Sequence, residues 1–448
     1  RHEGHEKTNT HNSQDYNVPY GNKVFYTMAI YLFIVLIIKK VYYYSAVKQR
    51  LNEHYKLRKF VVALVKLNPL LHTVIIGAIA VLSGFFDFKI TKMSVYFKKM
   101  ARLSYVLTIT NLFLVIPRSN FFVFMSYLDS IKLHVWLSTL ILVLAIAHSV
   151  LFMVKWTLQG VLFAKLFKMQ NFIGLTIFIK IVVLLVLSLT SYRRRNYESF
   201  YVIHQIAMFS FVVMTVFHSD PQVFTPFGFI NIVFLLMMMV NKIINNISRM
   251  DDPFIINEVK EYGSLKMISF KNNKINNMID YNLADDIFAP KMIPGAHIRL
   301  HESSIISWEF WLKPSHPFTL VSNEQLIIRE NEFSRFTSYN MTKLKDLSLV
   351  GNYRPNEQIF TLVDSLKTSG KENIISLVTG GSGISFILSI LTYILKIDHN
   401  DKAFVIWSIK DINESFLLLD FLKKNYSNKA NTKLELKFNI SQFKESPE

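Results

Sequence analysis

Cysteine is absent from this chain of 448 residues. Its absence excludes disulfide bonds, zinc–thiolate sites and iron–sulfur clusters, because each of these needs cysteine sulfur. Any redox cofactor that the chain binds must therefore be ligated by histidine or held without a covalent bond to the protein.

Acidic residues are also few, with 32 Asp and Glu against 50 Lys and Arg, which gives a formal net charge of +18. Such a basic excess is typical of nucleic-acid-binding proteins. Here, however, much of the Lys and Arg lies between long apolar runs, where positive side chains set membrane topology and contact anionic lipid. We therefore expect a lipid bilayer as the partner of this chain and no nucleic acid.

Apolar residues make up 51% of the chain but are unevenly distributed. Residues 1–22 are polar, long aliphatic and aromatic runs extend to about residue 247, and mixed sequence follows from Ser248. The pattern predicts a polar leader at 1–22, a membrane domain at 23–247 and a soluble part of roughly 200 residues. That soluble part is large enough for two small domains.

Seven apolar stretches approach the roughly 20 residues that a helix needs to cross the hydrocarbon core. They lie at residues 24–44, 69–88, 101–117, 134–154, 172–190, 201–218 and 226–247, and the third and sixth are short enough that the count could be six. The connection at 39–59 and the run Arg193–Arg195 are basic. Both should therefore be cytosolic, which also places the C-terminal soluble part in the cytosol. Four lysines, Lys89, Lys92, Lys98 and Lys99, fall on the opposite side and run against this orientation.

Two of the expected spans each carry a pair of histidines. His134 and His148 lie in the fourth span, and His204 and His218 lie in the sixth. The members of each pair are 14 residues apart (134 to 148 and 204 to 218), which is about 3.9 helical turns and about 21 Å along the axis. Both histidines of a pair therefore project from nearly the same face of their helix. Two spans with one span between them run parallel, so the four histidines form two levels.

Paired neutral imidazoles that face each other across a helix gap are what six-coordinate haem iron needs. Isolated packing or helix-end histidines are the alternative, but equal spacing on two parallel spans favours ligands, and ionisable residues inside a membrane are usually functional. We predict two haems, an inner one at His134/His204 and an outer one at His148/His218. His72 has no such partner and is interpreted as structural. Arg193–Arg195 could neutralise haem propionates, although a role in topology is favoured.

Short runs at Glu258–Tyr262, Ser264–Phe270 and His297–Leu300 predict a small antiparallel barrel, and Pro294–Ile298 is typical of a turn that leads into a strand. Further along, an aromatic ring, a rigid proline and a hydroxyl occur together at a strand edge, in the run His316, Pro317, Phe318, Thr319 and Leu320. Such a group can seat a planar isoalloxazine ring, with Thr319 and backbone groups as hydrogen-bond partners. Proline and aromatic residues also begin strands that bind no ligand.

A strand, a glycine turn, a helix and a second strand follow in that order, at Asn373–Val378, Gly380–Ser385, Phe386–Leu395 and Ala403–Ile409. The turn consists of Gly380, Gly381, Ser382, Gly383, Ile384 and Ser385. Glycines in this position let backbone N–H groups approach a pyrophosphate at the helix N-terminus, so we predict a nucleotide site. Lys410, after the second strand, could favour NADPH over NADH.

The two histidine pairs, Pro294–Ile298, His316–Leu320 and Gly380–Ser385 occur in the order found in fungal ferric reductases and NADPH oxidases. The resemblance covers about residues 70–425, and it is greatest to a yeast metalloreductase branch, an endoplasmic-reticulum subgroup similar to NADPH oxidases. It implies a multi-pass α-helical haem-binding bundle with its core at 101–218. It also implies a ferredoxin-reductase-like β-barrel FAD domain at 248–366 and an α/β NADPH-binding domain at 367–448, which we expect to be incomplete at its C-terminal end.

The resemblance implies a metalloreductase that passes electrons from cytosolic NADPH through FAD and two b-type haems to ferric or cupric ions. His134, His148, His204 and His218 would ligate haem iron, residues 316–320 would bind FAD, and residues 380–385 would bind NADPH. An oxidase of the same architecture that produces superoxide from O2 is the alternative. A membrane transporter with a regulatory tail is the alternative from another class. The expected location is the endoplasmic reticulum or the plasma membrane.

Two departures from the family pattern stand out. The flavin-phosphate segment is expected to resemble Glu-Gly-Pro-Tyr-Gly, but the nearest match, Val350–Arg354, lacks the acid and the second glycine. The Cys-Gly-Pro segment that family members carry beside the nicotinamide has no counterpart, because the chain has no cysteine and reaches Glu448 before that segment is expected.

Overall fold

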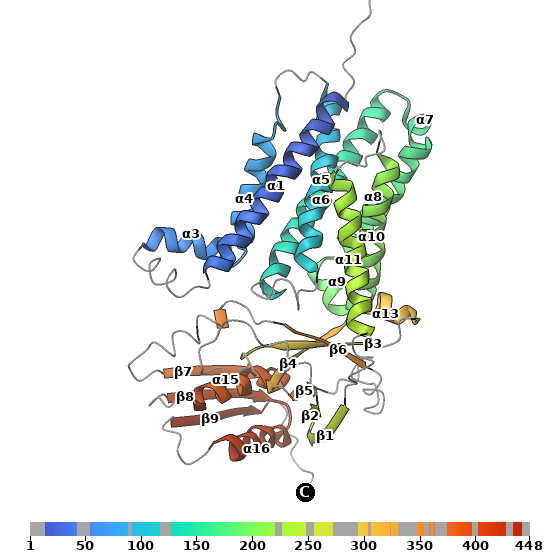
Figure 1. The fold of residues 1–448 in the computed structure, drawn as a ribbon. Helices are drawn as coiled ribbons and strands as arrows, with labels where there is room; N and C mark the ends of the chain where they lie inside the picture. Colours follow the sequence, from blue (N-terminus) through green and yellow to red (C-terminus); the bar gives the residue numbers. More distant parts are fainter. Residues whose placement is uncertain are drawn as a thin grey trace, which may run out of the picture. The chain divides into compact units, whose positions relative to one another are not determined.

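The structure is a computed structural model that describes residues 14–42, 54–87, 92–116, 127–219, 226–247, 255–271, 294–302, 306–322, 324–329, 347–353, 358–359, 362, 374–396, 402–426 and 433–440. The chain forms two compact units. One comprises Arg1–Ile116 with Asp129–Val240, and the other comprises Pro117–Leu128 with Asn241–Glu448. The first is helical and the second contains all the described strands (Figure 1).

The first unit is built of long apolar helices. Its elements are α1 (Gln14–Tyr42), α3 (Tyr55–Val65), α4 (Pro69–Leu82), α5 (Met93–Val115), α6 (Tyr127–Leu158), α7 (Leu162–Leu166), α8 (Met169–Leu187), α9 (Thr190–Arg195), α10 (Tyr197–His218) and α11 (Pro226–Ile247). Among the described residues, five helices are long and apolar enough to cross a membrane, namely α1, α6, α8, α10 and α11. The pair α3 and α4, bent by 85°, would make a sixth.

A helix lies at each of the seven predicted spans, but two of them differ from a simple crossing. Helix α4 has 14 residues, about 21 Å at 1.5 Å per residue, which is shorter than a hydrocarbon core of about 30 Å. Helix α5 has 23 residues, but it carries buried Lys99 and Arg102 and is not among the five helices that are apolar enough to cross a membrane.

Helix α1 begins at Gln14, within the segment 1–22 that the sequence assigns to a polar leader. Pro19 lies inside this helix, in its first turns. Asn17, Tyr20 and Val24 are buried, and the Tyr20 ring lies 5.3 Å from the Lys99 Nζ of α5. Packing against α5 therefore orders a segment whose polar composition alone does not indicate a helix.

Two buried lysines satisfy carbonyl groups at helix ends. Lys99 Nζ donates to the Gly84 oxygen at 2.6 Å and to the Phe85 oxygen at 3.1 Å, just beyond α4. Lys39 Nζ donates to the Val65 oxygen at 2.7 Å, at the break between α3 and α4. Such carbonyls lack partners within their own helix. Lys99 is one of four lysines that run against the predicted membrane orientation. Its hydrogen bonds to these carbonyl groups give a structural reason for its position.

The second unit begins with a six-stranded antiparallel sheet. Its elements are β1 (Ile255–Tyr262), β2 (Leu265–Lys271), β3 (His297–Glu302), α13 (Trp308–Leu312), β4 (His316–Ser322), β5 (Gln325–Arg329) and β6 (Leu347–Tyr353). The strand order is β1-β2-β5-β4-β3-β6. Alternate residues of these strands fill one apolar core, which includes Ile268, Phe270, Ile298, Leu320 and Leu326. This sheet is the predicted barrel.

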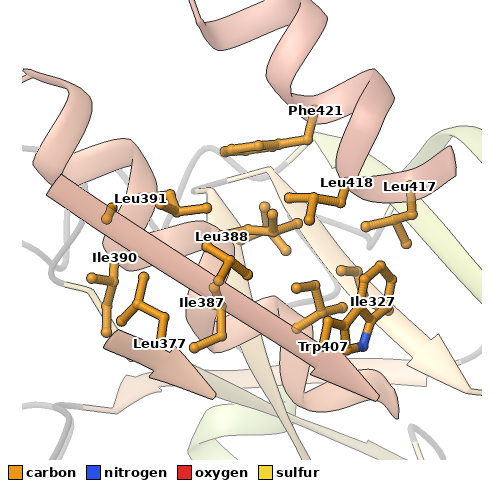
Figure 2. Close-up of a cluster of buried hydrophobic side chains, with 14 of the residues drawn as sticks. Ile327, Leu377, Ile387, Leu388, Ile390, Leu391, Trp407, Leu417, Leu418 and Phe421 are labelled. Carbon is orange, nitrogen blue, oxygen red and sulfur yellow. The ribbon is translucent and has the colours of Figure 1, made fainter. Parts of the chain in front are cut away.

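A parallel three-stranded sheet follows, in the order β7-β8-β9. Its elements are β7 (Ile374–Gly380), the 3-10 turn η2 (Gly381–Gly383), α15 (Ile384–Lys396), β8 (Lys402–Ile409), η3 (Ile412–Glu414), α16 (Ser415–Asn425) and β9 (Lys433–Ile440). Figure 2 shows apolar side chains of α15 and α16 meeting Trp407 of β8 and Ile327 of β5. The two sheets therefore share a hydrophobic core, and the α/β part of the predicted fold is present.

Candidate functional site

The four predicted haem ligands lie in two facing pairs. The ring centroids of His134 and His204 are 6.1 Å apart, with their planes at 87°. The ring centroids of His148 and His218 are 6.2 Å apart, with their planes at 79°. The first member of each pair lies on α6 and the second on α10, as the spacing in the sequence predicts.

These separations fit one metal ion between each pair of rings. A metal–nitrogen bond to histidine is about 2 Å long. With each ring centre about 1 Å beyond its nitrogen, two opposed imidazoles on one ion have centres about 6 Å apart. The pairing thus suits an iron held from both sides, and the two pairs are separated by about four helical turns.

Hydrogen bonds orient three of the four rings. The Nδ1 atoms of His148 and His218 lie 2.8 Å from the Phe97 oxygen and 2.7 Å from the Gln170 oxygen, and His134 Nδ1 lies 3.4 Å from the Asn111 oxygen. A carbonyl can only accept, so Nδ1–H donates in each case and Nε2 keeps its lone pair. This is the tautomer that a histidine uses when it ligates a metal through Nε2.

His204 is held differently, through ring stacking. The Phe200 ring stacks on it with centroids 5.6 Å apart and planes at 22°. The Arg193 guanidinium lies 6.0 Å from the centre of the same Phe200 ring. The Phe200 ring therefore lies between the candidate ligand His204 and Arg193, one of the three basic residues before α10.

A glycine makes room for the outer pair. A Cβ atom added to Gly174 of α8 would lie 2.7 Å from His218 Nδ1 and even closer to Cε1. The His218 ring therefore lies directly against the backbone of α8, where any side chain would displace it. Gly174 is not among the site residues predicted from the sequence, because a single glycine in an apolar span carries no signal of its own.

A cavity of about 480 Å³ opens beside His148 and His218. This volume is within the usual range for small-molecule sites, roughly 300–1,000 Å³. Four basic side chains line it, namely Lys98, Arg102, Lys165 and Lys168, and no carboxylate does among the described residues. The cavity thus combines an apolar, aromatic wall with positive charge, which suits a flat ligand that carries carboxylates.

The expected flavin-binding run forms strand β4, in which neighbouring side chains alternate between two faces. Leu320 is fully buried in the barrel core, and Phe318 packs against the same core. Pro317 is exposed and Thr319 is half-buried on the opposite face. Pro317 and Thr319 thus face away from this core, Phe318 is partly buried against it, and the side chain of His316 lies outside the described residues.

The glycine turn has the predicted strand–turn–helix geometry. Gly381 has a φ of 54°, which is costly for other residues. A Cβ on Gly383 would collide with Thr379 Oγ1 of the preceding strand. Ser385 and Ile384 lie in the first turn of α15 and are buried, with Ser385 Oγ donating to the Ser382 oxygen at 3.0 Å. The N-terminus of α15 follows this turn and can face a phosphate.

Arg329, on strand β5 of the other sheet, approaches the turn. Its guanidinium carbon would lie 3.1 Å from a Cβ on Gly381, and its Nη2 lies 3.0 Å from Glu414 Oε1. Arg329 Nε is buried and has no hydrogen-bond partner among the residues that the structure describes. Neither Arg329 nor Glu414 is predicted from the sequence, because residues 85 positions apart meet only after folding.

Among the described residues, no group of three or more His, Asp or Glu side chains could hold a metal ion. Each histidine pair offers only two ligands, which is the number that a macrocyclic metal needs from the protein when its ring supplies the remaining ligands.

Comparison with known proteins gives the following similarities. Residues 100–215 match the family described as "Ferric reductase like transmembrane component". The chain is 29% identical over 431 residues to "Probable metalloreductase AIM14" of Saccharomyces cerevisiae, covering 91% of this chain and 71% of that protein. A protein of the same name from Kluyveromyces lactis is 32% identical over 333 residues, covering 73% and 59%. A solved ferredoxin-NADP+ reductase from Plasmodium falciparum aligns with 42% of this chain and 72% of its own length, at 14% identity and a TM-score of 0.28.

Proposed function

We propose that the chain is a transmembrane metalloreductase of the ferric reductase family, on the basis of its similarity to the ferric reductase transmembrane component and to the yeast metalloreductases. In this proposal electrons pass from cytosolic NADPH to FAD, through two b-type haems, and then to ferric or cupric ions. The observation that carries the proposal is the pairing of His134 with His204 and of His148 with His218, at the separation that one metal ion requires.

The protein's contribution at the haem sites is to hold and orient the ligands. When bound, a bis-histidine haem supplies a one-electron carrier that has no open position on its iron. The carbonyls of Phe97 and Gln170 hold His148 and His218 with Nε2 free for a metal. Lys98, Arg102, Lys165 and Lys168 would supply positive charge for the carboxylates of a bound haem.

At the soluble sites the chain's contribution is again positioning, because the cofactors carry the redox chemistry. Pro317 and Thr319 would contact the flavin ring, and the N–H groups from Gly381 to Ser385 would hold the pyrophosphate of NADPH. The Arg329 guanidinium beside Gly381 adds positive charge where those phosphates would lie.

The proposed direction of electron flow follows from charge and connectivity. Arg193–Arg195 end α9 just before α10, and His204 lies in the second turn of α10, so His134/His204 form the level near this basic segment. Basic segments favour the cytosolic side, and the assignment gives the run Arg193–Arg195 more weight than Lys98, Lys165 and Lys168 beside the other level. We therefore assign the cavity beside His148 and His218 to the far side of the membrane, of the endoplasmic reticulum or of the plasma membrane.

The first experiment is a dithionite-reduced minus oxidised absorption spectrum of the full chain in detergent. The expected result is a b-type haem band with about two haems per chain. His134→Ala and His218→Ala should each remove about half of the band, because each variant breaks a different pair. A wild-type chain without a haem band would exclude the reductase and favour a transporter.

Oxygen is a second candidate acceptor, which would make the product superoxide. It is favoured over a bare metal ion by the four basic residues and the absence of carboxylates in the described lining of the outer cavity. A metal ion in a chelate of net negative charge is equally compatible with a cavity lined by basic residues. Supplying NADPH with either a ferric chelate or oxygen, and measuring Fe(II) or superoxide, would separate the two acceptors.

A further inference from the structure

Helix α8 carries one charged residue, Lys180, in a span of 19 otherwise uncharged residues. It lies eleven residues after Met169 and seven before Leu187, well inside the apolar segment. A charge at this depth is expensive, and such residues usually have a function or a specific partner. The function proposed above leaves Lys180 without a role.

The ammonium group of Lys180 points to helix α10, not to a membrane surface. Nζ donates to Ser210 Oγ at 2.9 Å and lies 3.7 Å from Met214 Sδ. Ser210 is six residues after His204 and eight before His218. At about 1.5 Å per residue, the ammonium therefore lies about 9 Å from one histidine level and about 12 Å from the other along the helix axis.

The surroundings of Lys180 provide little to neutralise it. The neighbouring Ile177 and Ile181 belong to an apolar cluster with Ala145 of α6, and Phe211 and Met214 of α10 pack against that cluster. Within the described parts of α6, α8 and α10, the acidic residues are Asp129 and Glu198, and each lies in the first turn of its helix. No carboxylate of these three helices lies between the two histidine levels.

We propose that Lys180 is a positioning residue for electron transfer, whose positive charge between the two histidine pairs stabilises the electron on either haem. The inference rests on the proposed haem sites. One-electron reduction adds one negative charge at a histidine level, with the flavin as the proposed donor, and a fixed positive charge nearby favours the reduced form. Because Lys180 lies between the levels, it raises the reduction potential of both haems and does not favour one strongly over the other.

The expected size follows from Coulomb's law. A unit charge about 10 Å away, at an effective dielectric constant of about 20, changes an equilibrium constant roughly tenfold. For a one-electron couple, a tenfold change corresponds to about 59 mV. An effect of this size is large enough to measure by potentiometric titration.

The test uses Lys180→Met, which keeps the length of the side chain and removes its charge, in the purified full chain. The measurement is a potentiometric titration of the haem absorption bands. Both midpoint potentials should fall, each by roughly a tenfold change in the reduction equilibrium. Lys180→Arg, which keeps the charge, should stay near the wild-type potentials.

Two further variants separate charge from structure. Ser210→Ala removes the hydrogen bond but leaves the ammonium in place, so its potentials should change much less than those of Lys180→Met. Lys180→Gln is neutral but can still bond to Ser210, so it serves where Lys180→Met fails to bind haem, and its potentials should fall. Unchanged potentials in a neutral variant with a full haem band would overturn the inference, while a wild-type chain without haem would overturn the proposed function itself.

Discussion

Gly174 illustrates how a single residue can determine a cofactor site inside a membrane. The absence of a side chain there lets the His218 ring lie against the backbone of α8, with its Nδ1 atom at 2.7 Å from the Gln170 oxygen of the same helix. The ring is therefore held between two helices by one hydrogen bond and one close approach. A metal ligand held in this way has little freedom to rotate.

We predict that Gly174→Ala impairs the outer haem site. The added methyl would collide with the His218 ring, so the ring must rotate away from His148. The haem absorption band should lose about half of its amplitude, while the His134/His204 site remains. Gly77→Ala is the matched control, because a Cβ there meets no atom within 4 Å. Retention of the full band in Gly174→Ala would contradict the role of this close approach.

A second residue, His297, should make the stability of the barrel depend on pH. Burial, together with the nearby Arg299 guanidinium, lowers the pKa of His297 from 6.5 to about 4. Between these values the unfolded chain binds a proton that the folded chain does not, so the folded state loses stability as the pH falls from about 6.5 to about 4. The loss is at most about 3 kcal/mol.

The change to test is His297→Gln, which removes the titrating group. The measurement is amide hydrogen exchange of strands β3 and β4 in the full chain, between pH 7 and about 4.5. In the wild type, the free energy of local opening should decrease as the pH is lowered. The variant should show a smaller slope. Equal slopes in the two proteins would show that His297 does not control this pH dependence.

At the scale of elements, the turn between β7 and α15 requires glycine at position 381 more than at position 380. Gly381 has a positive φ and lies against the Arg329 guanidinium, whereas a Cβ on Gly380 would meet its nearest atom at 3.9 Å. Trp407 Nε1 also donates to the Gly381 oxygen at 3.0 Å, which fixes the peptide plane of the turn. The turn is therefore held by contacts from both sheets.

We predict that Gly381→Ala weakens NADPH binding at least several-fold, since it strains the backbone by about 1 kcal/mol and pushes Arg329 away. The KM for NADPH in ferric-chelate reduction should rise more than kcat falls. Gly380→Ala is the paired control, and it should leave the KM for NADPH nearly unchanged. An unchanged KM for NADPH in Gly381→Ala would contradict the role of this turn in holding the nucleotide.

At the scale of the soluble unit, one buried carboxylate links the two sheets. Glu414 is fully buried and accepts hydrogen bonds from Ser264 Oγ at 2.6 Å, from Arg329 Nη2 at 3.0 Å and from the Lys410 backbone N–H at 3.2 Å. Ser264 and Arg329 belong to the barrel, and Lys410 follows β8. Together with the shared apolar core, this network makes the barrel and the α/β sheet a single packed body (Figure 2).

Arg329→Met should destabilise this body by about 3–5 kcal/mol, because it leaves the buried Glu414 carboxylate without its counter-charge. Thermal unfolding of the full chain, followed by the fluorescence of its flavin or tryptophan, should show a lower midpoint. Lys260→Met is the control, since Lys260 and Glu258 form an exposed pair at 3.7 Å that contributes little. A midpoint as high in Arg329→Met as in the control would contradict the role of the network.

The sequence by itself determined the features that depend on spacing along one helix or strand. The interval of 14 residues, the apolar spans and the order of strand, glycine turn and helix each follow from the fixed rise and period of regular structure. For this reason the pairing of His134 with His204 and of His148 with His218 could be predicted, as could the barrel and the α/β sheet.

Only the tertiary structure decided which residues meet between elements. The space at Gly174, the basic residues of the outer cavity, Lys180 beside Ser210 and Arg329 beside Gly381 all involve different helices or sheets. The start of α1 at Gln14 and the burial of Leu320 in the barrel core also follow from packing. The physical reason is that side-chain packing depends on the relative placement of elements, which the period of a single segment does not specify.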